Sequence, residues 1–316
     1  MYTINVTPDQ SLQQVLNQLP QEGEVCVLLA AGTWHEKVEL LRPNTILQGA
    51  GAGQTILTWQ DGAFDYMEDI GKRGTFRTAT LRTDGDHITL RDLTIENAAS
   101  PREKVGQAIA LYADGDCFTC EACELLSYQD TLFTAPLPPK EVEKNGFIGP
   151  KQYAPRKPQK HRYLRCTIKG DVDFIFGGAA AWFEGCDIVT RDGRENFSDP
   201  HCSYATAAST PEGQPYGYVF SNCRFLAEGC PPASVYLGRP WRAFAKTVLL
   251  HCELGKHIRP EGWHDWGKPD FHTCGLYGEY HNFGPGAVGE WASFAHQLSD
   301  EEAADYTMER FMRSPL

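Results

Sequence analysis

The chain has 316 residues and a formal net charge of −12, with 29 Lys and Arg against 41 Asp and Glu. This acidic balance excludes a general nucleic-acid binder, because the neutralisation of phosphates needs a basic surface. The longest apolar run, Val25 to Ala31, falls far below the ~18 residues that a membrane-spanning helix needs. We therefore expect a soluble globular protein with no nucleic-acid partner and no membrane partner.

Two features bear on the cellular location. The start, Met1 to Val6, has no basic segment followed by an apolar one, which argues against an export signal. Eleven cysteines are an odd number in a chain much larger than the small disulfide-stapled domains, and this favours a reducing compartment. We expect a cytoplasmic protein; the alternative is a secreted protein whose signal peptide lies outside this sequence.

Helical periodicity is scarce and concentrated at the two ends of the chain. Ser11 to Leu19 predicts a short N-terminal capping helix. Ser299 to Met312 predicts a helix with an acidic first turn, within a C-terminal tail that we place at 286–316. Between them, runs rich in Val, Ile, Leu, Thr and Phe alternate with polar residues and are broken by Gly, Asp and Asn, which is typical of strands.

One pattern returns along these strands: an apolar residue, a Cys or Leu three positions later, and another apolar residue two positions further on. Its middle residues are 30, 43, 20, 37 and 29 residues apart, which suits a solenoid whose loops grow outward. The pattern predicts an all-β parallel β-helix, and we treat residues 1–316 as one such domain. An antiparallel β-sandwich is the rival, although Asn-Gly hairpin turns are absent from the strand region. The middle residues are Leu93, Cys123, Cys166, Cys186, Cys223 and Cys252.

The glycine-rich run Gly49 to Gly53 superficially resembles a dinucleotide-binding loop. In that fold a helix follows the glycines directly, whereas Gln54 to Trp59 has the pattern of a strand. We therefore interpret the run as a tight turn of the solenoid.

The cysteines allow two further interpretations. Cys117, Cys120 and Cys123 have a metal-like spacing, but Cys120 and Cys123 occupy ladder positions that Leu fills elsewhere, which favours core packing over metal binding. Cys166 and Cys186 are one coil apart and could form a disulfide in an oxidising compartment.

Polar residues recur at one level of the predicted coils. Gln107 and Gln129 are 22 residues apart, and Asp173 follows after 44, twice that interval. The stretch from Pro136 to Arg162 holds six prolines, which predicts an excursion because central strands exclude proline. With the excursion set aside, the three residues fall at the same place on consecutive coils. Gln129 and Asp130 both join the site only if the strand bends or ends there, because neighbouring strand residues alternate faces.

Two carboxylates and two amides in one cleft suit acyl transfer. Close carboxylates do not ionise together easily, so one can keep a proton and act as an acid while the other stays charged as a nucleophile. The neutral amides can stabilise a developing oxyanion. Leu237 to Trp241 adds Arg239, whose fork of donors could orient a carboxylate, and Trp241, which could stack on a sugar.

Five segments, in this order, resemble the pectin methylesterases. The resemblance implies a right-handed parallel β-helix and the hydrolysis of galacturonate methyl esters to free carboxylates and methanol. It implies methyl-esterified homogalacturonan or oligogalacturonides as substrate, and neither a metal nor an organic cofactor. We expect a monomer. The segments are Gly32 to Glu36, Gln107 to Leu111, Tyr128 to Leu132, Asp173 to Gly177 and Leu237 to Trp241.

Motif by motif, the resemblance assigns a role to each residue of the group. Asp173 would be the nucleophile that attacks the ester carbonyl. Asp130 would protonate the departing methanol and then activate water. Gln107 and Gln129 would hold the oxyanion, and Arg239 would position Asp173. Phe176 and Trp241 would line the sugar subsites.

The 136–162 excursion is longer than the usual link between the two aspartate motifs of that family. It carries seven Lys and Arg against two Glu, a net charge of +5. A solvated loop is one interpretation; our hypothesis is that the excursion overhangs the cleft and attracts demethylated, anionic sugars. A cytoplasmic member would act on short methylated oligogalacturonides, which predicts a preference for oligomers over polymer.

Two other functions remain open. A β-helical pectate lyase or polygalacturonase would share the architecture, but a lyase needs calcium-binding carboxylates and a basic residue that abstracts a proton. A carbohydrate-binding solenoid without activity is the non-enzymatic alternative, and the presence of all five polar site residues argues against it.

Overall fold

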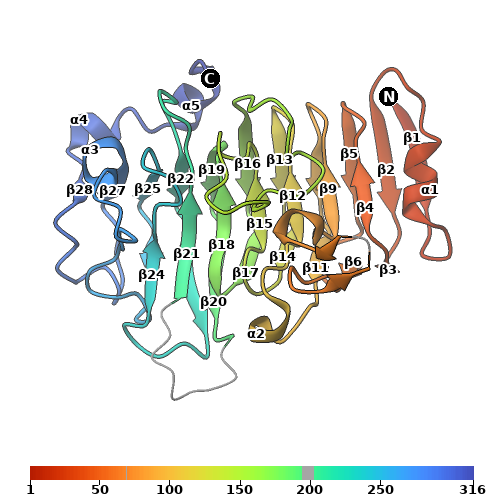
Figure 1. Ribbon diagram of the computed structural model, residues 1–316. Helices are drawn as coiled ribbons and strands as arrows, with labels where there is room; N and C mark the ends of the chain where they lie inside the picture. Colours follow the sequence, from red (N-terminus) through yellow and green to blue (C-terminus); the bar gives the residue numbers. More distant parts are fainter. Residues whose placement is uncertain (69, 194–202) are drawn as a thin grey trace.

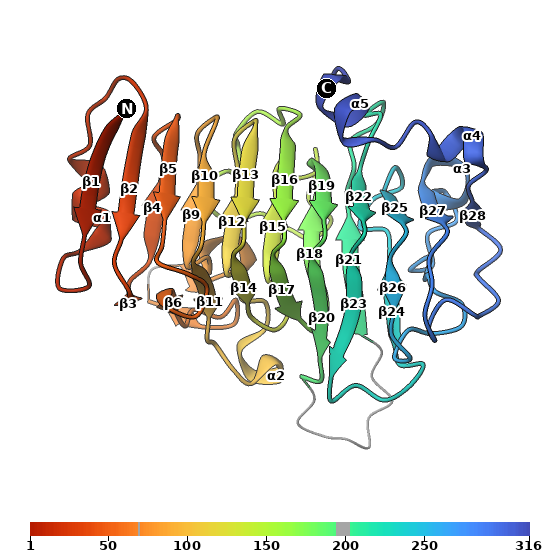
Figure 2. The same cartoon turned by 180° about the vertical axis from the view of Figure 1, so that it is seen from behind.

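A computed structural model of the chain describes residues 1–68, 70–193 and 203–316. The strands stack coil upon coil from the N-terminal end to the C-terminal end, as Figures 1 and 2 show from two sides. Apart from one small hairpin, the strands in the described ranges pair in parallel, in three sheets around a common apolar core. The fold is the right-handed parallel β-helix that the sequence predicts.

We name the three sheets A, B and C. Sheet A contains β1 (Tyr2–Val6), β2 (Val25–Leu29), β5 (Thr45–Gln48), β10 (Thr89–Arg91), β13 (Phe118–Glu121), β16 (Lys160–Leu164), β19 (Ala180–Glu184), β22 (Tyr218–Ser221), β25 (Lys246–Leu250), β27 (Leu276–Tyr280) and β28 (Ala295–Gln297). Sheet B contains β3 (Gly32–His35), β6 (Thr55–Trp59), β11 (Thr94–Asn97), β14 (Glu124–Leu126), β17 (Thr167–Gly170), β20 (Asp187–Arg191), β23 (Arg224–Glu228) and β26 (Glu253–Leu254). Sheet C contains β4 (Val38–Leu40), β9 (Leu81–Thr83), β12 (Leu111–Ala113), β15 (Leu132–Thr134), β18 (Val172–Gly177), β21 (Ser203–Ala208) and β24 (Val235–Gly238).

The repeating pattern of the sequence lies in register inside the coil. Its first positions pair from strand to strand along sheet A, from Leu90 to Leu249. Its third positions pair along sheet B, from Ile95 to Leu254. These side chains are buried, and the removal of stacked apolar surface from water is the main favourable contribution to folding. The ladder predicted from spacing alone is therefore confirmed.

Six cysteines belong to this core: Cys120, Cys123, Cys166, Cys186, Cys223 and Cys252. Every cysteine in the described ranges is a free thiol, and Cys120 and Cys123 are buried at their ladder positions. Cys166 and Cys186 stack on consecutive coils without a disulfide, and the Cys166 amide donates to the Cys186 sulfur at 3.4 Å. Packing thus explains the cysteines at the ladder positions.

The predicted N-terminal capping helix is confirmed as α1 (Leu12–Asn17), which begins at the N-cap Ser11. Leu12 and Leu16 are buried against the first coil. Glu36 caps the same helix, because its carboxylate accepts from the Ser11 hydroxyl at 2.6 Å and from the Leu12 amide at 2.9 Å.

The C-terminal tail contains two short helices where the sequence predicts one. They are α4 (Asp300–Ala303) and α5 (Met308–Arg313). The prediction is wrong because Thr307 starts a second helix, its hydroxyl accepting from the amide of Arg310 at 3.2 Å. Phe311 of α5 packs on Trp182 of β19, which fixes the tail against sheet A.

Several connections leave the coils. The predicted turn at Gly49 to Gly53 is confirmed, since β6 follows it directly. Residues 62–68 and 70–77 belong to a loop beside sheet C that contains an antiparallel hairpin, β7 (Tyr66–Met67) with β8 (Gly71–Lys72), and the 3-10 helix η1 (Thr75–Arg77). Two short helices lie elsewhere, α2 (Arg102–Val105) and α3 (Phe271–Cys274). Within the described ranges, no helix has the length and hydrophobicity to span a membrane.

The proline-rich stretch is an excursion without strands from residue 136 to 159. Its predicted end at Arg162 is wrong, because Lys160 and Arg162 already belong to β16 and pair in parallel with β13 and β19. From here on, "the excursion" means residues 136–159.

Candidate active site

A cavity of about 220 Å³ lies over the outer face of sheet C. Its apolar base is separate from the interior of the coil, because Tyr112, Phe133 and Phe176 point outward while their strand neighbours point inward. The polar residues come from loops and strand ends on four coils. All seven residues predicted for the site line this one cavity: Gln107, Gln129, Asp130, Asp173, Phe176, Arg239 and Trp241.

The predicted alignment of the coils is wrong by one residue. Leu111 pairs with Leu132, and Leu132 pairs with Ile175, so sheet C advances by 21 and 43 residues rather than 22 and 44. At this register Asp130, and not Gln129, stands level with Asp173. The sequence interval therefore predicts correctly which coils carry the site, but not which residue lies level with Asp173.

The backbone bends at both aspartates. Asp130 lies in a turn before β15 with a φ of 66°, which confirms the bend required for Gln129 and Asp130 to reach one site. Asp173 has a φ of 49° and lies where the pairing of β18 with β21 is irregular, between Val172 and Ile175. Such conformations are uncommon for residues other than Gly, and they gather at functional sites.

Arg239 holds Asp173 with two hydrogen bonds. Its Nε donates to Oδ1 at 2.9 Å and its Nη2 donates to Oδ2 at 2.7 Å. The guanidinium lies between two aromatic rings, 3.9 Å from the ring centre of Tyr204 and 3.8 Å from that of Trp266. Cation–π contacts and the bidentate pair together fix the arginine, and through it the carboxylate.

The two aspartates differ in their electrostatic surroundings. Burial raises the pKa of Asp130 well above its usual value, and the nearby negative charge of Asp173 raises it further. Burial also raises the pKa of Asp173, but there the charge and hydrogen bonds of Arg239 oppose the rise. Asp130 can thus hold a proton at a pH where Asp173 is ionised, which is the division of roles that an acid and a nucleophile need.

Aromatic side chains form a wall of the cavity. Trp241 lies against Phe176 and Phe76, with ring centres 5.7 and 6.5 Å away. Phe76 and Trp266 also line the cavity, and sequence reasoning missed both. Neither residue stands in a motif, and each reaches the site from a loop, so spacing along the strands carries no signal for them.

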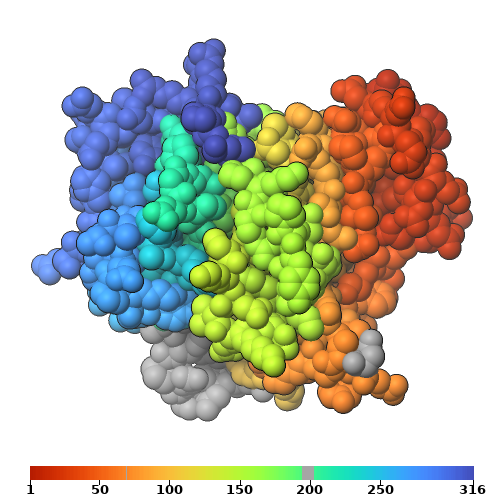
Figure 3. Space-filling view, turned by 45° about the horizontal axis from the view of Figure 1, so that its top comes forward, coloured from red at the N-terminus to blue at the C-terminus, as the bar shows by residue number. Residues whose placement is uncertain are grey.

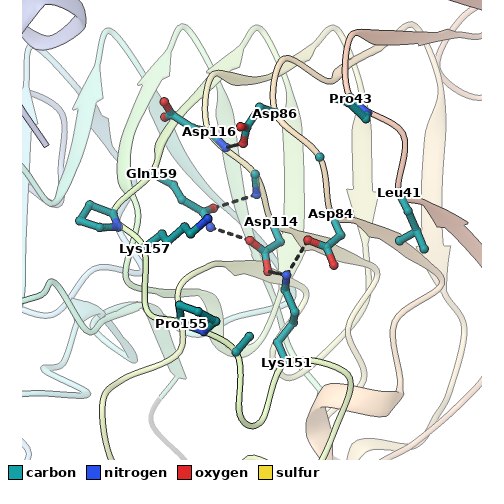
Figure 4. A pocket seen from close by; sticks show the side chains of 14 residues that line it. Leu41, Pro43, Asp84, Asp86, Asp114, Asp116, Lys151, Pro155, Lys157 and Gln159 are labelled. Carbon is teal, nitrogen blue, oxygen red and sulfur yellow. Dashed lines mark hydrogen bonds and ion pairs between the residues drawn. The ribbon is translucent and has the colours of Figure 1, made fainter. Parts of the chain in front are cut away.

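Figure 4 shows a second pocket beside sheet C, lined by two Asp-Gly-Asp segments at 84–86 and 114–116. Lys151 of the excursion pairs there with Asp84 at 2.5 Å and with Asp114 at 3.3 Å. Gln159 donates to Asp114 at 2.5 Å. These contacts anchor the excursion to the edge of sheet C. In the described part of the chain, no group of three acidic, His or Cys side chains is arranged to hold a metal ion.

Two basic residues of the predicted 136–162 stretch are thus engaged elsewhere. Lys151 is held by the two aspartates. Lys160, at the start of β16, donates to the backbone oxygens of Met312 and Ser314 near the C-terminus. The hypothesis that the excursion attracts anionic sugars stays a prediction, and these two lysines do not contribute to it.

Comparisons with known proteins identify the family of the chain. A model of the pectinesterase family matches residues 6–137 and 153–315. The chain is 33% identical to Pectinesterase 2 of Arabidopsis thaliana, over 90% of this chain and 45% of that protein. It is 32% identical to a pectinesterase/pectinesterase inhibitor of Prunus persica, over 92% of this chain and 52% of that protein. The chain spans about half the length of these curated relatives.

Solved structures show the same fold. The pectin methylesterase of carrot superposes with a TM-score of 0.79 at 26% identity, covering 98% of this chain and 92% of the carrot chain. The pectin methylesterase PemA of Erwinia chrysanthemi superposes with a TM-score of 0.81 at 24% identity, covering 100% and 98%. With the family match over nearly the whole sequence, the chain belongs to the pectinesterase family.

Proposed function

We propose that the protein is a carboxylic ester hydrolase that removes methyl esters from the galacturonate units of pectin or of oligogalacturonides. The observation that carries the proposal is the pairing, in one cavity, of an arginine-bound Asp173 with a buried Asp130 whose pKa is raised. Membership of the pectinesterase family supports it. So does a structural neighbour, a pectin methylesterase crystallised in complex with a hexasaccharide.

The residues allow a two-step mechanism. The ionised carboxylate of Asp173 attacks the C6 carbonyl carbon, and the amides of Gln107 and Gln129 stabilise the oxyanion. As the bond to the methoxy oxygen breaks, protonated Asp130 gives its proton to that oxygen, and methanol leaves an acyl-enzyme. Asp130, now a carboxylate, takes a proton from water, whose oxygen attacks the acyl carbon and releases the free acid and Asp173.

The surroundings suit each role. Arg239 keeps Asp173 in one orientation and favours its ionised form. Phe176 and Trp241 provide the apolar faces on which a sugar ring can stack. The steps as written need neither a metal nor an organic cofactor.

The experiment measures methanol released from methylated oligogalacturonides of defined length. Methanol without a new unsaturated bond, followed by ultraviolet absorbance, supports the hydrolase. Absorbance without methanol would indicate the lyase, and binding without either would indicate the non-enzymatic carbohydrate-binding solenoid.

The remaining properties are proposals too. We propose one domain over residues 1–316 and a monomer. We propose the secreted alternative for location, because pectin is a cell-wall polymer and because core packing, rather than a reducing compartment, accounts for the buried cysteines. Buried thiols are unreactive and therefore compatible with an oxidising environment.

A further inference from the structure

Residues 138–152, which we call the 138–152 segment, fall between the two parts of the chain that match the family. The segment nevertheless reaches the candidate site, because Gly146 lines the cavity. In Figure 3 the yellow-green surface of the excursion stands forward and borders the cyan and blue surface of the C-terminal coils. A part of this chain that the family match leaves out therefore helps to shape the cleft.

The segment crosses the site between two loops. On one side Gly74, of the loop that carries Phe76, is so close to Ile148 that a Cβ there would stand 2.6 Å from its Cγ2. On the other side the Nη2 of Arg242 donates to the carbonyl oxygen of Lys140 at 3.0 Å. The segment thus touches both the loop before β9 and the loop after β24.

Phe147 fills the middle of this crossing. Its ring lies 5.8 Å from Phe76 and 6.0 Å from Trp241, both edge to face. Phe147 is only 5% exposed, so it is a packed part of the wall and not a surface residue. Aromatic pairs of this geometry contribute beyond their buried area.

The base of the excursion is fixed as firmly. The guanidinium of Arg156 donates to the carbonyl oxygens of Pro138, Lys151, Gln152 and Ala154 at 2.6 to 3.2 Å, which ties the two ends of the segment together. Lys151 adds its ion pairs with Asp84 and Asp114. The 138–152 segment is thus held at both ends and at Phe147, so we expect a bulky ligand not to displace it easily.

We infer that the 138–152 segment sets the length of substrate that the site accepts. The inference rests on the proposed function. When a galacturonate unit inside a long polymer reacts, the chain must leave the cleft on both sides of that unit, so the cleft needs two open ends, or exits. A short chain or a chain end needs only one open exit. Phe76, Phe147 and Trp241 pack together into one wall, which in this inference closes one of these exits. The cavity of about 220 Å³ is smaller than a typical drug-sized site of roughly 300–1,000 Å³. The substrate class is therefore short methyl-esterified oligogalacturonides, with esters inside long chains disfavoured by steric exclusion.

The test compares kcat/KM per ester bond on methylated trimers and hexamers with that on highly esterified pectin, measured as methanol release. The variants are Phe147→Ala and a deletion of residues 139–150 bridged by Gly-Ser-Gly. Val142→Ala is the matched control, since Val142 lies on the same segment and is 83% exposed. Thermal unfolding checks that each variant is folded. If the deletion variant does not fold, Phe147→Ala alone still tests the inference.

We expect the wild type to prefer the oligomers, and both variants to raise kcat/KM on pectin by about fivefold or more with little change on the oligomers. Val142→Ala should match the wild type. Equal wild-type rates per ester on both substrates, or an unchanged ratio in Phe147→Ala, would overturn this inference and leave the hydrolase standing. No methanol from any substrate would overturn the proposed function and the inference with it.

Discussion

Arg239 and Asp173, 66 residues apart in the chain, meet in a bidentate ion pair inside the cavity, with donor–acceptor distances of 2.9 and 2.7 Å. Asp130, level with Asp173 on the neighbouring coil, has no such cation bonded to it in the described part of the chain, and its pKa rises further. One arginine thus distinguishes two aspartates in the same apolar surroundings. The predictions about activity follow from this asymmetry.

Replacing the arginine should change both the rate and its pH dependence. Arg239→Ala removes the positive charge that opposes the rise in the pKa of Asp173, so that pKa increases. Asp173 then becomes protonated at a higher pH, and the acidic limb of the kcat/KM profile moves upward in pH. Loss of a partner in a buried charge pair should also reduce kcat/KM by about 30-fold or more. Methanol release across a pH series measures both effects.

The control for that variant is Arg224→Ala, which breaks an exposed ion pair with Asp187 far from the cavity. It should leave the profile unchanged. An acidic limb that stays in place in Arg239→Ala would show that the arginine does not set the ionisation of Asp173.

The stack of aromatic rings in the core should dominate stability. Phe183 lies between Tyr163 and Phe220 with nearly parallel rings, 4.6 and 4.4 Å away. Phe183→Ala leaves a cavity in the middle of the coil and should lower the free energy of unfolding by about 3–5 kcal/mol. Urea unfolding measures it, with Phe283→Ala as control because Phe283 is 56% exposed. Similar losses in the two variants would contradict the stacked core.

A buried acid should make stability fall as the pH rises. Burial raises the pKa of Glu279 to about 8, although hydrogen bonds from Trp263 and Asn282 oppose the shift. The native state therefore holds a proton that the unfolded chain releases near its ordinary pKa of 4.5. Stability is fully present below that value and is lost as the pH rises through about 8.

Glu279→Gln keeps an oxygen that can accept from Trp263 and removes the titration. Its urea midpoint should fall less than that of the wild type between about pH 5 and pH 9. Comparison of the two pH series cancels the contributions of the other titrating groups. Parallel curves for the two proteins would contradict a neutral Glu279 in the native state.

The sequence predicts the parts of this structure that repeat. The ladder from Leu90 to Leu249 needs only apolar residues at matching places, and the shortest interval of 20 residues already equals one coil. The residues with site chemistry were predictable because Asp130, Asp173 and Arg239 stand in motifs of unusual composition.

What the sequence could not provide depends on irregular backbone. The one-residue error in the level of Asp173 arises because Gln129 lies in a turn before β15 and departs from the register of sheet C, which advances by 21 and 43 residues; spacing alone cannot reveal this. Phe76 and Trp266 line the cavity from loops, and Phe147 packs behind Phe76 from the excursion; tertiary packing alone selects them among the aromatic residues. The split of the C-terminal tail at Thr307 was readable in principle, because threonine is a good N-cap residue.

The most direct measurement is the rate of methanol release from a methylated oligogalacturonide by the wild type, Asp173→Asn and Asp130→Asn. Thermal unfolding first verifies that all three proteins are folded and unfold at the same temperature. The account predicts a loss of about 10³-fold or more for Asp173→Asn, which has no nucleophile, and of about 10²-fold or more for Asp130→Asn, which cannot transfer the proton. A rate within about tenfold of the wild type in Asp173→Asn would contradict the assignment of that carboxylate as the group that attacks the ester.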